Sequence, residues 1–327
     1  MSKTLIISPN WIGDAVMTLP LINTLFKHGH IIDILAPNIT APIYENSISV
    51  AKVIHHNLPH KKILLKERIK LVSELQKNNY EYIYILPNSF KSAIIPILLK
   101  AKHKIGYQGE WPRKYFLTKS LVNQDKKIAM VEHYHNLSMG KLHFSLQPKL
   151  DLDNAKTLEY LNRFNLSNKE YIVIAIGAEY GPAKQWPFEH FKTLIEIVLN
   201  QYNNLYIVLL GSNKDMQQAE LLVKNEKIIN LCGKTNLTEA MYIIKKADKI
   251  LTHDSGLMHI SAAIGTELTA IYGSTSPHHT PPLSNNAKYI WLNLECSPCF
   301  KRTCPLKHYA CLNNISPEQV FENLFSS

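Results

Sequence analysis

The residues best suited to chemistry lie in the segment 249–259, which reads Lys-Ile-Leu-Thr-His-Asp-Ser-Gly-Leu-Met-His. An apolar run ends there and passes at once into a helical pattern, so we expect a buried strand, a tight turn and a helix start. Asp254 and Ser255 are placed to cap the free N–H groups of that helix, and Gly256 lets a ligand approach the backbone closely. A helix N-terminus attracts anions, so the turn suits a phosphate, although an ordinary capped helix has the same pattern.

Asp254 and His259 each have a second interpretation. The Asp254 carboxylate should not touch a phosphate, because like charges repel, and it is better placed for sugar hydroxyls or as a cap. His259 lies one turn further along the expected helix. A lone histidine on a helix is more often a structural hydrogen-bonding residue than a catalytic one.

A second turn, Asn10-Trp11-Ile12-Gly13-Asp14, follows the first expected strand. Asp14 is the only carboxylate near the end of that strand, where a general base would be useful. The alternative is a carboxylate that only interacts with the dipole of the helix expected to begin there.

A third turn, residues 177–187, is too long for a simple connection and contains a single lysine, Lys184. A lysine in such a loop can neutralise a diphosphate as a mobile point charge. The alternative is a solvated surface lysine, but the neighbouring Trp186-Pro187 fixes the start of the next helix and favours the functional interpretation.

These turns need a scaffold of alternating strands and helices. The first half of the chain has expected strands at 4–8, 31–36, 52–55, 82–86 and 104–107, and expected helices at 15–27, 66–78 and 89–99. After a linker near Pro148 the alternation restarts, with strands at 171–176, 205–210, 228–231, 249–253 and 268–272 and helices at 188–200, 214–225, 237–245 and 255–264. We therefore predict an α/β protein of two doubly wound, Rossmann-like domains that face a central cleft.

Length and composition agree with this prediction. A chain of 327 residues suits two domains of about 150 residues, and no apolar run reaches the roughly 20 residues that span a bilayer, so we expect a cytosolic protein. The net charge of +10 implies anionic partners, but the basic residues are scattered and carry no nucleic-acid-binding signature. The chain has neither a Gly-x-Gly-x-x-Gly turn nor a P-loop, which argues against a dinucleotide oxidoreductase and a P-loop phosphotransferase.

Taken together, the motifs resemble those of the bacterial ADP-heptose:lipopolysaccharide heptosyltransferases of glycosyltransferase family 9, most closely the type II enzymes. Each piece alone is a weak match, but the pieces span almost the whole chain in the family's order: 13–14 with 17–20, 177–184 with 186–187, 254–259, 272–277 and 296–302.

The resemblance implies a GT-B fold in which domain 1–150 binds the acceptor and domain 151–315 binds ADP-heptose, with a C-terminal helix 316–327 that could pack back on the first domain. It implies inverting transfer, without a cofactor or an essential metal, from ADP-L-glycero-β-D-manno-heptose to the first heptose of the lipopolysaccharide inner core. The acceptor would be heptosylated Kdo2-lipid A, and the enzyme would make peripheral contact with the cytoplasmic face of the inner membrane.

By position, the resemblance implies a role for each candidate residue. Asp14 corresponds to the general base and Lys184 to the catalytic, donor-site lysine. A carboxylate that holds the nucleotide ribose corresponds to Glu239, and the sugar-diphosphate turn to Asp254, Ser255, Gly256 and His259. This chain departs from the family's usual pattern at two places, with His253 where asparagine is common and Gln185 where a second basic residue often follows the lysine.

Three other functions remain open at this point. Heptosyltransferase I differs in its acceptor, which is Kdo, while a nucleotide-sugar 2-epimerase has a similar two-domain architecture but is expected to bind UDP. A non-catalytic nucleotide-sugar sensor would have no use for the Asp14 carboxylate.

A cysteine cluster is not explained by the resemblance. Four of the five cysteines fall within 16 residues, near His308: Cys296, Cys299, Cys304 and Cys311. That density is typical of a structural zinc site, but the spacing is not that of a common zinc finger, and a cytosolic setting argues against disulfides. Packed thiols, a metal site and a disulfide therefore remain alternatives, all with a structural rather than a catalytic role, while Cys232 is expected to be an isolated buried residue.

Overall fold

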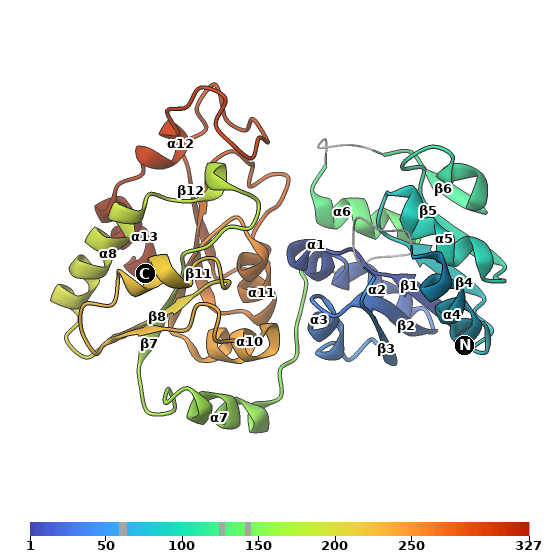
Figure 1. The fold of residues 1–327 in the computed structure, drawn as a ribbon, viewed down its shortest axis with the longest axis horizontal. Helices are drawn as coiled ribbons and strands as arrows, with labels where there is room; N and C mark the ends of the chain where they lie inside the picture. The colour runs from blue at the N-terminus through green and yellow to red at the C-terminus, as the bar shows by residue number, and fades with distance from the viewer. Residues whose placement is uncertain (59–63, 124–127, 141–144, 327) are drawn as a thin grey trace. The chain divides into compact units, whose positions relative to one another are not determined.

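The computed structural model describes residues 1–58, 64–123, 128–140 and 145–326. The chain divides into two compact units, Met1–Asp151 and Leu152–Ser327, so the division falls one residue beyond the expected boundary (Figure 1). Each unit is an α/β structure built on its own sheet.

The first unit contains a parallel six-stranded sheet in the order β3-β2-β1-β4-β5-β6. Its strands are β1 (Ser2–Ile7), β2 (His30–Pro37), β3 (Lys52–His56), β4 (Tyr82–Ile85), β5 (His103–Tyr107) and β6 (Lys119–Leu121). Its helices are α1 (Ile12–Met17), α2 (Leu19–Lys27), α3 (Ala41–Glu45), α4 (Leu65–Gln76), α5 (Phe90–Leu98) and α6 (Met130–His135), with 3-10 turns η1 (Arg113–Phe116) and η2 (Asn136–Ser138).

The prediction of one helix over 15–27 was wrong, because the segment forms two helices that meet at Thr18. Pro20 lies at the N-terminal end of α2. Proline has no N–H to continue the hydrogen-bond ladder of α1, so the first helix ends there. The break leaves α1 as a short helix that carries Asp14 in its first turn.

The second unit contains a parallel six-stranded sheet in the order β12-β11-β10-β7-β8-β9. Its strands are β7 (Tyr171–Ala175), β8 (Tyr206–Leu210), β9 (Ile228–Asn230), β10 (Lys249–His253), β11 (Glu267–Tyr272) and β12 (Ala287–Trp291). Its helices are α7 (Asn154–Arg163), α8 (Phe188–Gln201), α9 (Met216–Glu220), α10 (Leu237–Lys246), α11 (Gly256–Ile264), α12 (Ala310–Asn313) and α13 (Pro317–Phe325), with a 3-10 turn η3 (Pro182–Lys184).

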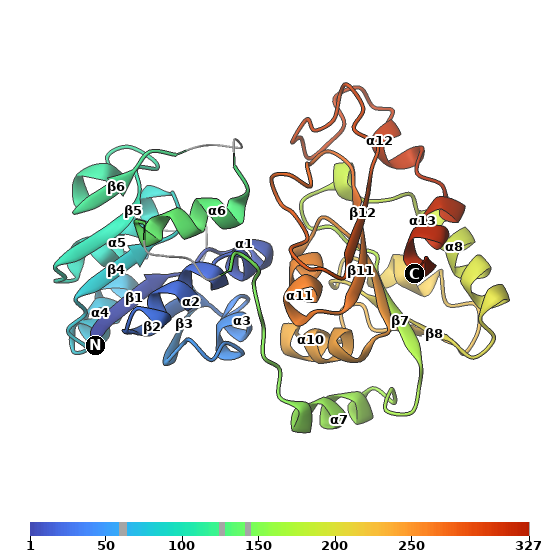
Figure 2. The same cartoon turned by 180° about the vertical axis from the view of Figure 1, so that it is seen from behind.

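Both sheets have the same topology, since the first and fourth strands of each unit are neighbours at its centre. In the second unit, helices α8 and α13 lie on one side of the sheet and α10 and α11 on the other (Figures 1 and 2). This is the doubly wound arrangement predicted from the alternating pattern. The expected helix 214–225 is shorter than predicted and is reduced to α9.

The C-terminal helix α13 belongs to the second unit. It packs on α8 and on strands β10, β11 and β12, and it buries Val320 and Leu324 in the same hydrophobic cluster as Leu194 and Val198 of α8. The apolar face of this helix is therefore used by its own unit, and a further contact of the helix with the first domain stays a prediction.

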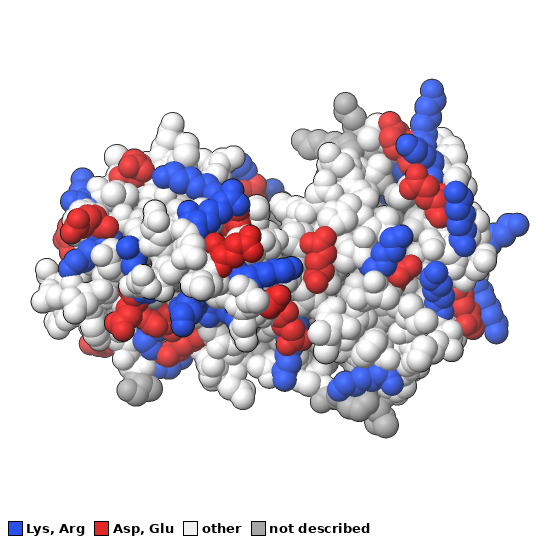
Figure 3. Space-filling model, turned by 90° about the horizontal axis from the view of Figure 1, so that it is seen from below, with Lys and Arg blue, Asp and Glu red and all other residues white. Residues whose placement is uncertain are grey.

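The described residues contain no helix that is both long and apolar enough to cross a bilayer. On the face drawn in Figure 3, basic and acidic side chains are interspersed over the surface. The excess of positive charge is thus spread out on that face.

Candidate active site

The turn between β10 and α11 is the centre of the second unit's candidate site. Helix α11 begins at Gly256, and Ser255 is its N-cap residue with an extended backbone. No side chain caps this helix, which contradicts the expectation for Asp254 and Ser255. The Ser255 hydroxyl instead lies 3.2 Å from the hydroxyl of Thr252. The first N–H groups of α11 are consequently left without a side-chain acceptor, and such groups are suited to an anion.

Asp254 forms an ion pair with Lys184. The Lys184 ammonium donates to the Asp254 carboxylate at 2.6 Å and to the Asp254 backbone carbonyl at 3.0 Å. The two side chains are 12% and 3% exposed, respectively, so the pair is largely shielded from water. A lysine ammonium has three N–H donors, and two of them are directed at Asp254 here, which leaves one for a ligand.

The topology of the sheet explains why these two residues meet. Lys184 lies in the loop that follows β7, and Asp254 directly follows β10. Strands β7 and β10 are hydrogen-bonded neighbours, so the loops at their carboxyl ends emerge side by side. This pair of strands is the point where the strand order reverses, and in open α/β sheets ligands bind at such points.

His253 contacts both ends of the loop 177–187, the lysine loop, which carries Lys184. Its Nε2 accepts a hydrogen bond from the Trp186 backbone N–H at 2.9 Å, and its Nδ1 lies 3.4 Å from the Gly177 carbonyl. Burial is the main cause that lowers the pKa of His253 to about 4, so the ring is neutral near pH 7. With Nε2 acting as an acceptor, the proton is on Nδ1 and points to Gly177.

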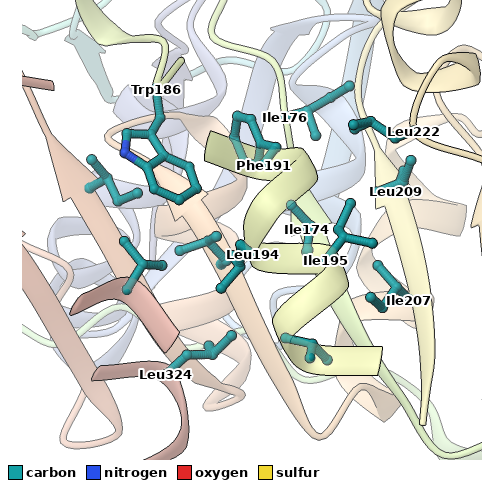
Figure 4. Close-up of a cluster of buried hydrophobic side chains, with 14 of the residues drawn as sticks. Ile174, Ile176, Trp186, Phe191, Leu194, Ile195, Ile207, Leu209, Leu222 and Leu324 are labelled. Carbon is teal, nitrogen blue, oxygen red and sulfur yellow. The ribbon is translucent and has the colours of Figure 1, made fainter. Parts of the chain in front are cut away.

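Trp186 anchors the same loop in the hydrophobic core of the second unit. Its ring is buried in a cluster with Ile174, Phe191 and Leu194 (Figure 4), and its indole N–H donates to the Ile315 carbonyl at 2.9 Å. The loop that carries Lys184 is therefore held to the sheet by His253 and to the core by Trp186. Gln185 lines a pocket together with Trp186 and Phe191.

His259 and Glu239 occupy buried positions on neighbouring helices. Burial is the main cause that lowers the pKa of His259 to about 4, so this residue offers a neutral ring rather than a positive charge. Glu239 forms a capping box with Asn236 at the start of α10, and its other carboxylate oxygen forms an ion pair with Arg163. Each carboxylate oxygen can accept more than one hydrogen bond, so a ribose hydroxyl could still be bound.

In the first unit, Asp14 lies in the first turn of α1 beside two buried tyrosines. The hydroxyl of Tyr134 in α6 is hydrogen-bonded to the Asp14 side chain. Burial first, and then the Asp14 charge, raise the pKa of Tyr134 well above its usual value, so the phenol is neutral and donates. Burial raises the pKa of Tyr44 to about 12, with a smaller contribution from the Asp14 charge, and the Tyr44 hydroxyl accepts a hydrogen bond from Ser8. These contacts orient the carboxylate.

A pocket lies at the carboxyl ends of β1, β2 and β4 in the same unit. Its polar lining includes Asn10, His56, Arg68, Ser89 and Lys91. Arg68 is buried and donates to the Lys91 carbonyl at 3.1 Å. The lining combines two cations with hydroxyl groups, so it is suited to an acidic, polyhydroxylated molecule.

All five cysteines are free thiols, so the disulfide alternative was wrong. Four of them, Cys296, Cys299, Cys304 and Cys311, line one small pocket together with His308. Within the described ranges, no group of three or more His, Cys, Asp or Glu side chains is arranged to hold a metal ion. The geometry therefore favours packed thiols.

Comparison with known proteins agrees with the fold and the motifs. The model of the family described as "Glycosyltransferase family 9 (heptosyltransferase)" matches residues 68–310. The chain is 34% identical to lipopolysaccharide heptosyltransferase 2 of Escherichia coli K12 over 98% of its length and 97% of that protein's. It is 36% identical to lipooligosaccharide heptosyltransferase 2 of Haemophilus influenzae, again over 98% and 97% of the two chains.

A solved structure extends this similarity to the fold. The structure of E. coli ADP-heptose lps heptosyltransferase II has a TM-score of 0.85 and 32% identity, over 98% of this chain and 97% of that chain. The chain has the two-domain GT-B fold and is a glycosyltransferase. It belongs to glycosyltransferase family 9, the heptosyltransferases.

Three residues at the site were missed or misjudged from the sequence. His253 stands out in the sequence only as a departure from the family's usual pattern, whereas its ring holds the loop that carries Lys184. Tyr134 gave no local signal, because it reaches Asp14 from a helix more than 100 positions away. Tyr180 has the Lys184 ammonium 4.8 Å from the centre of its ring, a contact that sequence spacing alone does not reveal.

Proposed function

We propose that this enzyme transfers L-glycero-D-manno-heptose from ADP-L-glycero-β-D-manno-heptose to the first heptose of the lipopolysaccharide inner core, with heptosylated Kdo2-lipid A as acceptor. The observation that carries the proposal is the 30–36% identity, over nearly the full chain, to relatives named heptosyltransferase 2. The second unit would bind the donor and the first unit the acceptor.

Asp14 acts as the general base in this proposal. It takes the proton from the attacking acceptor hydroxyl while the oxygen forms a bond to the anomeric carbon of the donor. The bond between that carbon and the diphosphate breaks in the same displacement, so the configuration inverts and ADP leaves. The hydrogen bond from Tyr134 supports this role, because a fixed carboxylate needs no reorientation during the reaction.

Lys184 and the turn between β10 and α11 stabilise the leaving diphosphate. Lys184 supplies its remaining N–H donor, and the N–H groups at the uncapped start of α11, near Ser255 and Gly256, supply others. Asp254 and the neutral His259 contact sugar hydroxyls, and Glu239 contacts the ribose. The Lys184–Asp254 ion pair supports this assignment, since it holds the ammonium beside the start of the helix.

The charge of the chain and a pocket of the first unit support the acidic acceptor and the membrane contact. A phosphorylated, acidic glycolipid suits the net charge of +10 and the cations Arg68 and Lys91 in the pocket of the first unit. Peripheral binding at the cytoplasmic face of the inner membrane would follow from attraction to anionic lipids. Neither ADP-heptose nor the acceptor requires a cofactor for this single displacement.

ADP release from ADP-heptose tests the proposal when it is measured with two acceptors in parallel. We expect release with Kdo2-lipid A that carries one heptose and little with Kdo2-lipid A that carries none. The reverse preference would identify heptosyltransferase I, and no release with either would contradict the proposal. A vesicle-binding measurement with and without anionic lipid tests the membrane contact separately.

A further inference from the structure

Tyr180 in the lysine loop interacts with two cations. The Lys184 ammonium lies 4.8 Å from the centre of its ring, and the Arg302 guanidinium carbon lies 5.5 Å from the same point. The Tyr180 hydroxyl donates to the Phe300 carbonyl at 2.8 Å. A residue from the cysteine-containing segment is thus brought to the loop that carries the donor-site lysine.

Backbone contacts fix Arg302 in this position. Its carbonyl accepts a hydrogen bond from the Ala183 N–H at 3.1 Å. Gly181 has a φ of +141°, and a Cβ added there would lie 2.7 Å from the Arg302 carbonyl oxygen, so only glycine allows the two segments to approach this closely. Ser274 joins the same two segments, because its N–H donates to the Ala183 carbonyl and its carbonyl accepts from the Phe300 N–H. The backbone of Arg302 is therefore fixed by the fold next to the loop that carries Lys184.

The charges of the two cations are balanced differently. Lys184 is paired with Asp254, which is 3% exposed, so the pair together carries no net charge. Arg302 is exposed, and among the described residues no carboxylate forms an ion pair with it. A diphosphate at the lysine would bring negative charge that Lys184 alone, already neutralised, does not offset. Arg302 provides the missing charge, with a planar group that matches phosphate oxygens.

We propose that Arg302 is a second donor-binding cation. Its guanidinium, which lies against the ring of Tyr180, contacts the diphosphate of the sugar nucleotide. Tyr180 is then a positioning residue, because it holds both cations without touching the reacting atoms. The inference rests on the proposed function only in placing a nucleoside diphosphate at Lys184. It concerns binding of the diphosphate and not the choice of sugar or acceptor.

Calorimetric binding of ADP and of adenosine to the full chain tests the proposal. We expect Arg302→Ala to weaken ADP binding about tenfold, to leave adenosine binding unchanged and to reduce the salt dependence of ADP affinity. Arg302→Lys should retain part of the affinity, because it keeps the charge but not the planar fork. Lys301→Ala is the matched control: it removes the same charge from the neighbouring exposed position and should have little effect.

Three results would overturn the proposal. Unchanged ADP affinity in Arg302→Ala is one, and an equal loss in Lys301→Ala is another, because it would indicate only a general effect of charge. A parallel loss of adenosine affinity and thermal stability in Arg302→Ala is the third, because Arg302 would then only support the loop. Heptose transfer by the wild-type enzyme is measured separately, so ADP binding that depends on Arg302 without any transfer would contradict the proposed function and leave this assignment intact.

Discussion

The two units have the same sheet topology but use the turn after their first strand differently. After β7, a long loop carries Lys184, and this cation is neutralised by the carboxylate of Asp254 and fastened by contacts from several elements. After β1, a short helix carries Asp14, and its carboxylate lies near the buried phenols of Tyr134 and Tyr44.

This difference matches two distinct chemical demands. A site for a leaving diphosphate needs fixed positive charge, so its cation must be held in place before the donor arrives. A general base needs a carboxylate that can still accept a proton, and a neutral phenol orients it without adding a positive charge. The same fold thus provides two different turns from equivalent positions. The loop after β7, which carries Lys184, is the charged turn, and the turn after β1, which carries Asp14, is the carboxylate turn.

The largest effect is expected from removal of the base. Asp14→Asn should lower the transfer rate by about 10²–10⁴-fold while ADP-heptose binding stays near normal, since the variant loses the proton acceptor but keeps the donor site. Rates from ADP release and affinities from calorimetry check this, with Asp14→Glu as a control that keeps the carboxylate. Near-normal turnover in Asp14→Asn would mean that Asp14 only stabilises its helix.

Substitution of Lys184 tests whether the charged turn binds the diphosphate. Lys184→Ala should weaken ADP-heptose binding roughly tenfold or more and hardly affect adenosine, because the lysine meets the diphosphate and not the base. The substitution also leaves the buried Asp254 carboxylate without its cation, so thermal stability should fall.

The double variant Lys184→Met with Asp254→Asn separates these two effects. It should recover stability, because no buried charge is left unpaired, but it should not recover affinity for ADP-heptose. Recovery of both properties would show that the lysine serves the fold and not the ligand.

The sequence predicted the scaffold well because alternating apolar runs and helical patterns depend on local residues. It failed at Pro20, a local residue that divides a helix which periodicity alone extends over 15–27. It also failed where a distant residue decides, since a long-range ion pair takes Asp254 away from the predicted capping role. The ring of His253 reaches two loop residues about 70 positions earlier, a contact that no local pattern encodes.

His253 therefore provides a test of how firmly the charged turn is fastened. Its pKa is lowered from 6.5 to about 4, so between these values the unfolded state binds more protons and stability decreases as the pH falls. The loss should be about 2 kcal/mol between pH 7.5 and pH 5 for this residue. His259, with its pKa also near 4, should add a similar loss.

Replacement of His253 by asparagine checks this assignment. An asparagine can accept from Trp186 and donate to Gly177 without titrating. His253→Asn should therefore show a smaller loss of thermal stability between pH 7.5 and pH 5 while ADP affinity is kept, whereas His253→Ala should weaken ADP binding. An unchanged pH dependence in His253→Asn would assign the acid sensitivity to other groups.

The smallest effects are expected in the cysteine cluster, which lies next to the charged turn but supplies no group to it. Backbone N–H groups, first that of Tyr309, hold the pKa of the Cys304 thiol below its usual value, while burial raises that of Cys311 to about 11. Since the thiolate is the reactive form, iodoacetamide should label Cys304 well before Cys311 at pH 7.5, as measured by mass spectrometry.

Serine variants of the same two cysteines then separate packing from catalysis. Cys311→Ser places a hydroxyl in the hydrophobic cluster and should cost about 1–3 kcal/mol of stability, whereas Cys304→Ser should cost less. Both variants should retain transfer activity at low temperature, because neither thiol contacts a substrate. A loss of turnover in Cys304→Ser with stability and ADP affinity unchanged would give the cluster a part in the reaction.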